Sequence, residues 1–246
     1  MSQVDAASEY EYALPDHWID HKFDPEGPFT KLHSYYVGRV VDIIKQSGAR
    51  TVLEAGCGDG WNVAQFVAAG LDVSGCDWSA KGIQYAQMNS PSARLYCGDV
   101  RDDEFIRRFP EKFDAIALVE VTEHIPPEDT VEALRTLLTR LRPGGIFVLT
   151  TPHLNYPNTA KNHYRHFTPE QLEDILTEVG GMEVVAVEGY GDLDADRRFW
   201  RKMRWFDNRH YSIKYFANRL RRNYRYVGPP AWDRAHGIIL TARKTP

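Results

Sequence analysis

Short apolar runs alternate with amphipathic segments between residues 50 and 150. Apolar runs of four to eight residues are typical of buried strands, and helical patterns between them are typical of a parallel sheet covered by helices. The runs expected to form strands are 51–55, 71–76, 93–97, 113–119, 145–151, 182–187 and 236–243. The pattern therefore predicts an α/β fold with a mostly parallel sheet of seven strands and helices on both faces.

The same pattern divides the chain into four parts. Residues 1–47 are expected to form an N-terminal helical cap, with a helix from about Phe29 to Lys45. Residues 48–188 form the expected ligand-binding core, and residues 235–246 the final core strand. Residues 189–234 separate the last two strands by far more than an ordinary loop, which predicts an insertion with structure of its own.

A glycine-rich turn follows the first expected strand in the stretch VLEAGCGDGW. Gly56, Gly58 and Gly60 stand at alternate positions, where the absence of a Cβ lets the backbone approach a ligand closely. The dinucleotide pattern G-x-G-x-x-G is not met, because position 61 is Trp. A turn of this kind taken alone is weak evidence for a ligand, because a tight turn without a ligand also explains it.

Carboxylates at the ends of three successive strands strengthen the ligand interpretation. Glu54, Asp77 and Asp99 end the first three strands, at the edge where open α/β sheets bind ligands. Asp77 is placed to accept the hydroxyl groups of a ribose, and Asp99 to accept an exocyclic amine of adenine. An acidic site of this kind suits a cationic adenosyl ligand better than a pyrophosphate.

Taken together, these motifs resemble the class I S-adenosylmethionine-dependent methyltransferases. E-x-G-x-G-x-G, the two Asp residues, FDAIALVEVTEHI and the LRPGG turn carry the resemblance, which is nearest to the ubiquinone-pathway O-methyltransferases. It implies a Rossmann-like sheet whose last strand is antiparallel, with S-adenosylmethionine as the cofactor. It also implies that the three glycines line the methionine part, that Asp77 holds ribose and that Asp99 with Val100 holds adenine. Cys57, Trp78 and Glu120 are expected to complete the cofactor site.

Two histidines are the candidates for the transfer step. His124 follows the fourth strand and His166 the fifth, so both are expected at the active edge. Methyl transfer depends mainly on positioning, but a hydroxyl acceptor also benefits from a base. Either histidine is therefore expected to assist deprotonation of a hydroxyl acceptor, while His153 and His163 are weaker candidates.

A metal-assisted reaction is the alternative interpretation of the same residues. Glu120, Glu123 and His124 form E-x-x-E-H, and His166 would supply a fourth ligand to a divalent cation. This pattern resembles metal-assisted methyltransferases that act on small RNAs, but it also occurs in relatives without a known metal. A divalent metal is accordingly possible but not favoured, and the competing reading has Glu120 contacting the cofactor.

Charge is distributed very unevenly. Residues 197–226 contain eleven Lys or Arg and one acid, whereas the remaining chain has 19 basic and 33 acidic residues. The cations alternate with aromatic residues, as in segments that lie on anionic membranes or contact RNA. The alternative is a lid whose aromatics pack on the core while its arginines pair with the acidic core.

These observations favour O-methylation of a small-molecule or lipid-linked acceptor. Peripheral contact with an anionic membrane is possible, nucleic acid is a less favoured partner, and the oligomeric state is left open. The acidic first fifteen residues and the absence of long apolar runs lead us to expect a cytoplasmic protein, at most peripheral to the inner membrane surface. Aminopropyl transfer and a non-catalytic module that binds the cofactor and acts through its basic arm stay open as alternatives.

Overall fold

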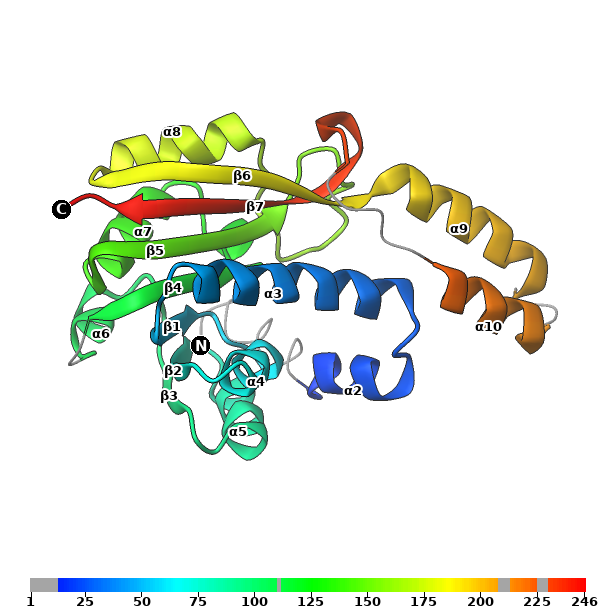
Figure 1. Ribbon diagram of the computed structural model, residues 1–246, viewed down its shortest axis with the longest axis horizontal. Helices are drawn as coiled ribbons and strands as arrows, with labels where there is room; N and C mark the ends of the chain where they lie inside the picture. The colour runs from blue at the N-terminus through cyan, green and yellow to red at the C-terminus, as the bar shows by residue number, and fades with distance from the viewer. Residues whose placement is uncertain (1–12, 110–111, 208–212, 225–229) are drawn as a thin grey trace.

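A seven-stranded sheet in the order β3-β2-β1-β4-β5-β7-β6 forms the centre of the computed structural model (Figure 1). The structure describes residues 13–109, 112–207, 213–224 and 230–246. The strands are β1 Thr51–Ala55, β2 Asp72–Asp77, β3 Arg94–Cys97, β4 Phe113–Val119, β5 Leu141–Pro152, β6 Met182–Asp192 and β7 Ala235–Lys244. β1 to β5 pair in parallel, while β7 pairs antiparallel with β5 and β6. The predicted α/β fold and its antiparallel last strand are confirmed.

Helices cover both faces of this sheet (Figure 1). On one face lie α3 Pro28–Gln46, α4 Trp61–Ala68 and α5 Ala80–Asn89, and on the other α6 Asp103–Arg107, α7 Thr130–Leu138 and α8 Pro169–Val179. Apolar residues at helical spacing explain the packing, as in α3, where Val37, Val40 and Ile44 are buried. The remaining helices are α2 Asp16–Phe23, α9 Leu193–Phe206 and α10 Lys214–Asn223, with short 3₁₀ turns η1 Thr122–His124 and η2 Trp232–Arg234.

Strand β6 is longer than its sequence predicts. The apolar run ends at Val187, but the strand continues to Asp192 because Tyr190 pairs with Gly237 and Asp192 with Ala235. Residues 189–192, which the sequence assigned to the insertion, are therefore part of the sheet. The sequence of this stretch, Gly-Tyr-Gly-Asp, lacks the alternation that marks a strand, and only the pairing with β7 reveals it.

Beyond β6, the insertion folds into a hairpin of two helices. α9 leaves the end of β6 and α10 runs back beside it, so that the pair extends past the edge of the sheet where the parallel strands end (Figure 1). Arg209, Tyr211, Arg225 and Tyr226, which belong to the basic aromatic segment, lie outside the described residues. Among the residues that are described, no helix is long and apolar enough to cross a membrane.

Candidate active site at the carboxyl edge of the sheet

The glycine turn between β1 and α4 adopts a backbone that requires glycine. Gly56, Gly58 and Gly60 all have positive φ, at 78°, 50° and 79°. A Cβ on Gly56 would lie 2.3 Å from a methyl group of Val121, in the turn that follows β4. The turn is thus closely packed against the end of β4, as the sequence predicts for a site where the backbone approaches a ligand.

Glu54 is a buried carboxylate without a hydrogen-bond partner among the described residues. Its side chain, at the end of β1, is fully buried, and neither oxygen meets hydrogen-bond geometry, although the Asn62 amide lies nearby. Burial raises the pKa of Glu54 well above its usual range, and the charges of Asp59 and Asp77 act in the same direction. Because an unpaired buried carboxylate is costly, this group fits a site completed by a cationic donor such as an ammonium group.

Asp77 holds two turns together at the end of β2. Its carboxylate accepts hydrogen bonds from the backbone N–H of Gly58 at 2.9 Å and of Ser79 at 2.8 Å. The sequence assigned Asp77 to a ribose, and the structure shows that it also fixes the glycine turn. A carboxylate has about four acceptor positions, so ribose hydroxyls would share this one with the two N–H donors. Cys57 is buried and Trp78 is partly exposed beside Asp77.

Asp99 and Val100 follow β3, where the adenine is expected. Val100 is buried, whereas the Asp99 carboxylate is engaged by Arg101, with Nε at 2.9 Å and Nη2 at 2.6 Å from Oδ2. An adenine amine at this position would share the carboxylate with Arg101. The sequence did not indicate this pairing, although two residues of separation placed it within reach.

Glu120, directly after β4, combines backbone strain with a raised pKa. It is the one non-glycine residue with positive φ, at 54°, in the described part of the chain. Its Oε1 accepts hydrogen bonds from the hydroxyls of Thr150 and Tyr190, both at 2.8 Å. Burial raises the pKa of Glu120 to about 7, although these two hydrogen bonds favour the charged form. Strain and a pKa near neutrality together mark a functional position.

Hydrogen bonds fix which nitrogen of each active-edge histidine carries the proton. His124 Nδ1 lies 3.1 Å from the carbonyl oxygen of Asn162, so Nδ1 donates and Nε2 keeps its lone pair. His166 Nδ1 likewise donates to the Tyr156 carbonyl at 2.9 Å, and its Nε2 accepts from His163 Nδ1 at 2.9 Å. The lone pair of His166 is thus used by His163, whose own Nε2 keeps a lone pair.

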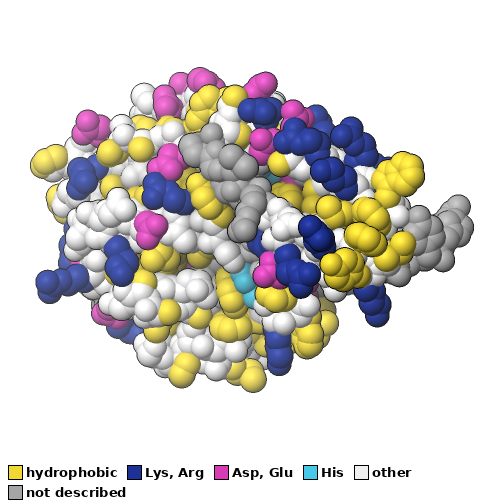
Figure 2. All heavy atoms as spheres, turned by 45° about the vertical axis from the view of Figure 1, so that its right-hand side comes forward, with side chains coloured by type: hydrophobic (Ala, Val, Ile, Leu, Met, Phe, Trp, Pro, Cys, Tyr) yellow, Lys and Arg dark blue, Asp and Glu magenta, His cyan; other side chains and the backbone are white. Residues whose placement is uncertain are grey.

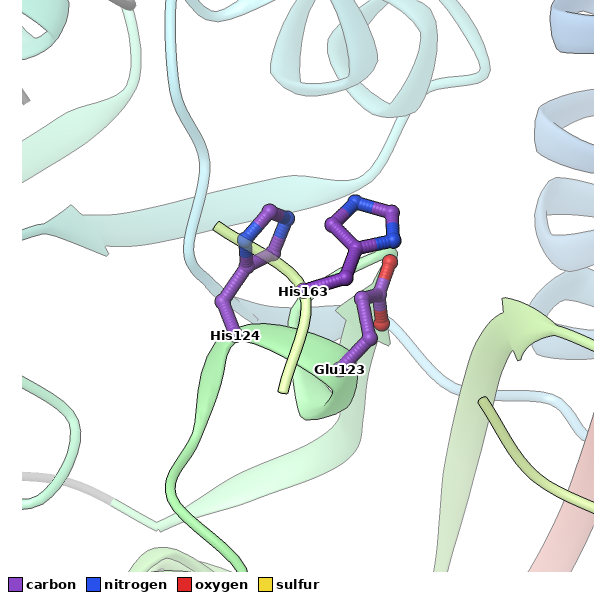
Figure 3. Close-up of side chains that lie close together, drawn as sticks. All are labelled: Glu123, His124 and His163. Carbon is purple, nitrogen blue, oxygen red and sulfur yellow. The ribbon is translucent and has the colours of Figure 1, made fainter. Parts of the chain in front are cut away.

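Glu123, His124 and His163 bring their ligand atoms within 4.8 Å of one another. Figure 3 shows the three side chains close together, Glu123 and His124 from the turn after β4 and His163 from another segment. Glu123 is buried and its Oε2 accepts a hydrogen bond from Thr151 at 3.0 Å. Burial and the charges of His124 and His166 lower the pKa of His163 to about 4, so its ring is neutral near pH 7. His163, rather than His166 or Glu120, completes this group.

The N-terminal helix α2 packs on the glycine turn, a contact that was not predicted from the sequence. The backbone N–H of His17 donates to the Asp59 carboxylate at 3.0 Å, and Trp18 Nε1 donates to the Asp59 carbonyl at 3.1 Å. The ring of His21 stacks on Trp61 with centroids 3.6 Å apart. The i, i+4 spacing of His17 and His21 is the signal in the sequence that placed them on one helical face.

Comparisons with known proteins agree with this architecture. A family model described as a methyltransferase domain matches residues 30–219. Ubiquinone biosynthesis O-methyltransferases are similar in sequence: that of Serratia proteamaculans is 25% identical over 159 residues, covering 63% of this chain and 65% of that protein. The enzyme of Cupriavidus pinatubonensis is 30% identical over 154 residues, covering 60% and 57%. The matched part is thus less than two thirds of the length of either relative.

Solved structures share the fold at low sequence identity. The N-methyltransferase NodS of Bradyrhizobium japonicum, in complex with S-adenosylhomocysteine, has a TM-score of 0.64 at 16% identity and covers both chains fully. Magnesium protoporphyrin IX methyltransferase from Synechocystis has a TM-score of 0.62 at 16% identity, covering 99% of this chain and 100% of that one. At this level of identity the likeness establishes the fold.

Proposed function

Because the chain belongs to the methyltransferase-domain family, we propose that it transfers a methyl group from S-adenosylmethionine to a hydroxyl group of a small molecule. The observation that carries the proposal is the buried, unpaired Glu54 beside three positive-φ glycines and Asp77 at one sheet edge. The cofactor supplies an electrophilic methyl group on a cationic sulfonium. Glu54, the glycine turn, Asp77 and Asp99 with Val100 would hold it, and Glu120 would border the reacting end.

Proton removal from the acceptor belongs to His124 or His163 in this proposal. Both rings keep a lone pair on Nε2, because each Nδ1 donates to a neighbour. His166, which the sequence favoured as a base, becomes a positioning residue: it accepts from His163 and is itself anchored on the Tyr156 carbonyl. A base oriented in this way contributes about 10²–10⁴-fold to proton transfer.

The relatives and the charge of the insertion support an acceptor class. The curated relatives are named for ubiquinone biosynthesis, which supports a small-molecule acceptor. The cationic and aromatic surface of α9 and α10, at the same edge of the sheet, further favours an acceptor linked to a lipid and reached by peripheral contact with an anionic membrane.

Incubation of the protein with labelled S-adenosylmethionine and extracted metabolites, lipids and RNA tests this function. Label is expected in a hydroxyl-bearing small molecule or lipid. With that acceptor, His124→Gln is expected to lower kcat by about 100-fold. The matched control is His153→Gln. His153 lies nearby but contacts Asn155 and Trp232 instead of Glu123, His124 and His163. Label in RNA alone, or in no fraction, would refute the proposal in favour of an RNA-directed enzyme or a non-catalytic module.

Metal-assisted transfer is a second candidate, favoured by the group of Glu123, His124 and His163. One carboxylate and two imidazoles suit a divalent cation that would acidify a hydroxyl acceptor. Calorimetric titration of Mg²⁺, Mn²⁺ and Zn²⁺ into the protein would show a single site, lost in His163→Gln and kept in His153→Gln. Activity that survives exhaustive chelation would exclude metal-assisted transfer and would leave proton removal by a histidine as the mechanism.

A further inference from the structure

The α9–α10 hairpin buries only part of its aromatic residues. Phe199 and Met203 of α9 pack against Ala217 of α10 and Tyr224, with Phe206 and Leu220 at the margin of this small core. The apolar faces of the two helices thus face each other. Because this packing is internal to the hairpin, the two helices do not expose one continuous aromatic face to solvent.

The base of the hairpin is fixed to the body of the protein. Lys31 of α3 donates to the backbone carbonyls of Arg221 at 2.8 Å, Arg222 at 3.3 Å and Tyr224 at 3.4 Å. Arg221 also pairs with Asp24. At the start of the hairpin, the Asp192 side chain caps α9 by accepting hydrogen bonds from the N–H groups of Asp194 and Ala195. The hairpin therefore projects as an anchored element.

The far end of the hairpin is apolar and exposed. Trp205 is 72% exposed and Tyr215 64% exposed, and Ile213 and Phe216 are exposed beside them. These four residues, which we call the aromatic tip, lie where α9 ends and α10 begins. Figure 2 shows hydrophobic side chains gathered on this part of the molecule, with Lys and Arg side chains around them.

Exposed cations lie along the two helices that carry the aromatic tip. The two helices carry nine Lys or Arg residues and two Asp residues. Six of these cations are exposed and make no ion pair with any carboxylate of the described chain: Arg198, Arg201, Lys202, Lys214, Arg219 and Arg222. The acidic core was the alternative partner for the arginines, but Arg221 pairs instead with Asp24 of the N-terminal part, and these six cations face solvent.

We propose that the aromatic tip and the exposed cations of its two helices dock the protein on an anionic phospholipid bilayer. Aromatic rings concentrated at one end of an element suit the interface of a bilayer, where such rings sit at headgroup level and cations meet anionic lipids. Base stacking along a nucleic acid strand would instead need aromatics distributed along a groove. Membrane docking rests on the proposed function in one respect, that docking would bring the active site to an acceptor in the membrane.

Co-sedimentation of the full chain with vesicles tests the docking. Vesicles of phosphatidylcholine alone and of phosphatidylcholine with 30% phosphatidylglycerol are compared at about 50 mM and 300 mM salt. The wild type is expected to bind the anionic vesicles, less strongly at high salt, and to bind the neutral vesicles weakly. The double variant Trp205→Ser/Tyr215→Ser should bind at least about tenfold more weakly. Lys214→Gln/Arg219→Gln should bind about tenfold more weakly and lose part of the salt dependence.

Matched variants control for loss of apolar surface and of charge. Phe23→Ser/Met88→Ser removes residues that are 74% and 78% exposed on α2 and α5. Arg107→Gln/Arg108→Gln removes two exposed cations, the last residue of α6 and the residue that follows it. Both should bind like the wild type, and all variants should keep the wild-type melting temperature. The inference would be overturned if the wild type failed to bind vesicles at both salt concentrations, or if the control variants lost as much vesicle binding as the tip variants. Binding to an RNA oligonucleotide in place of vesicles would also overturn it. Vesicle binding needs neither cofactor nor acceptor, so docking without methyl transfer would overturn only the proposed function.

Discussion

Single residues at the sheet edge serve both the fold and the candidate chemistry. Gly56 illustrates this: its φ of 78° and its approach to Val121 exclude a Cβ, while the turn that it forms faces the expected cofactor. Glu54, Asp77 and Asp99 could be named from the sequence because the carboxyl ends of parallel strands meet at one edge. Their partners could not, since the contact of Asp77 with the Gly58 N–H depends on how two turns meet in space.

Substitution of two glycines of the turn should give different results. Gly56→Ala and Gly60→Ala should each destabilise the protein by about 1–3 kcal/mol, because both positions have positive φ and a Cβ would clash. For Gly56 the clash is with a side-chain methyl of Val121, whereas for Gly60 it includes the backbone Cα of Ala86 at 2.6 Å. Adding Val121→Ala should therefore rescue part of the loss in Gly56→Ala, and adding it to Gly60→Ala should not. Urea unfolding of the single and double variants measures both effects, and equal rescue would contradict the geometry.

The raised pKa of Glu120 predicts a pH dependence of stability. Its pKa in the folded protein is about 7, against 4.5 in the unfolded chain, so the folded protein holds a proton that the unfolded chain releases. The resulting stabilisation is complete below pH 4.5 and is lost as pH rises through about 7. Glu120→Gln keeps a neutral side chain, so its free energy of unfolding relative to wild type should rise between pH 5 and 8, by about 3 kcal/mol at most. Parallel pH profiles of wild type and variant would argue against a buried, protonated Glu120.

At the scale of elements, apolar periodicity predicted the strands and most helices but not their contacts. The seven apolar runs correspond to the seven strands, with β6 extended by pairing that its own sequence does not encode. His163 and His166 are three residues apart on one loop. The sequence favoured His166 as the neighbour of His124, but His163 is the one that lies beside it. Loop conformation decides which ring faces Glu123, and no periodic pattern reports it.

Neighbouring arginines of α10 should differ in their effect on stability. Arg221 pairs with Asp24 at the base of the hairpin, whereas Arg222 is exposed and without an acidic partner in the described chain. Arg221→Ser should destabilise the hairpin by up to about 1 kcal/mol, the range of a partly exposed ion pair, while Arg222→Ser should have no measurable effect. Hydrogen exchange of the α10 amides compares the two variants directly. Equal protection in both would show that the Asp24 pair contributes nothing to the anchoring of the hairpin.

For the whole molecule, the uneven charge of the sequence becomes a spatial arrangement. The nine cations of α9 and α10 extend beyond the carboxyl edge of the sheet on the hairpin, and the acidic excess belongs to the rest of the chain. Composition predicted that one segment meets an acidic partner. Composition did not predict that Phe199, Phe206 and Tyr224 would pack into a local core, because that packing depends on the antiparallel arrangement of two helices whose turn the sequence does not mark.

The contact between α2 and the glycine turn has a kinetic consequence. α2 has no fully buried residue and is held by polar contacts with Asp59 and by the stacking of His21 on Trp61, so it should detach far more readily than the core unfolds. Because it lies on the turn expected to hold the cofactor, exchange of spent for fresh cofactor would wait for this detachment, and the first turnover should outrun those that follow. Burial opposes the charged form of His17, but Asp59 outweighs it and raises the pKa of His17, so the ion pair weakens as pH rises above that pKa. Steady-state turnover should therefore accelerate toward alkaline pH relative to the initial burst, and Asp59→Asn should reduce the difference between the two rates.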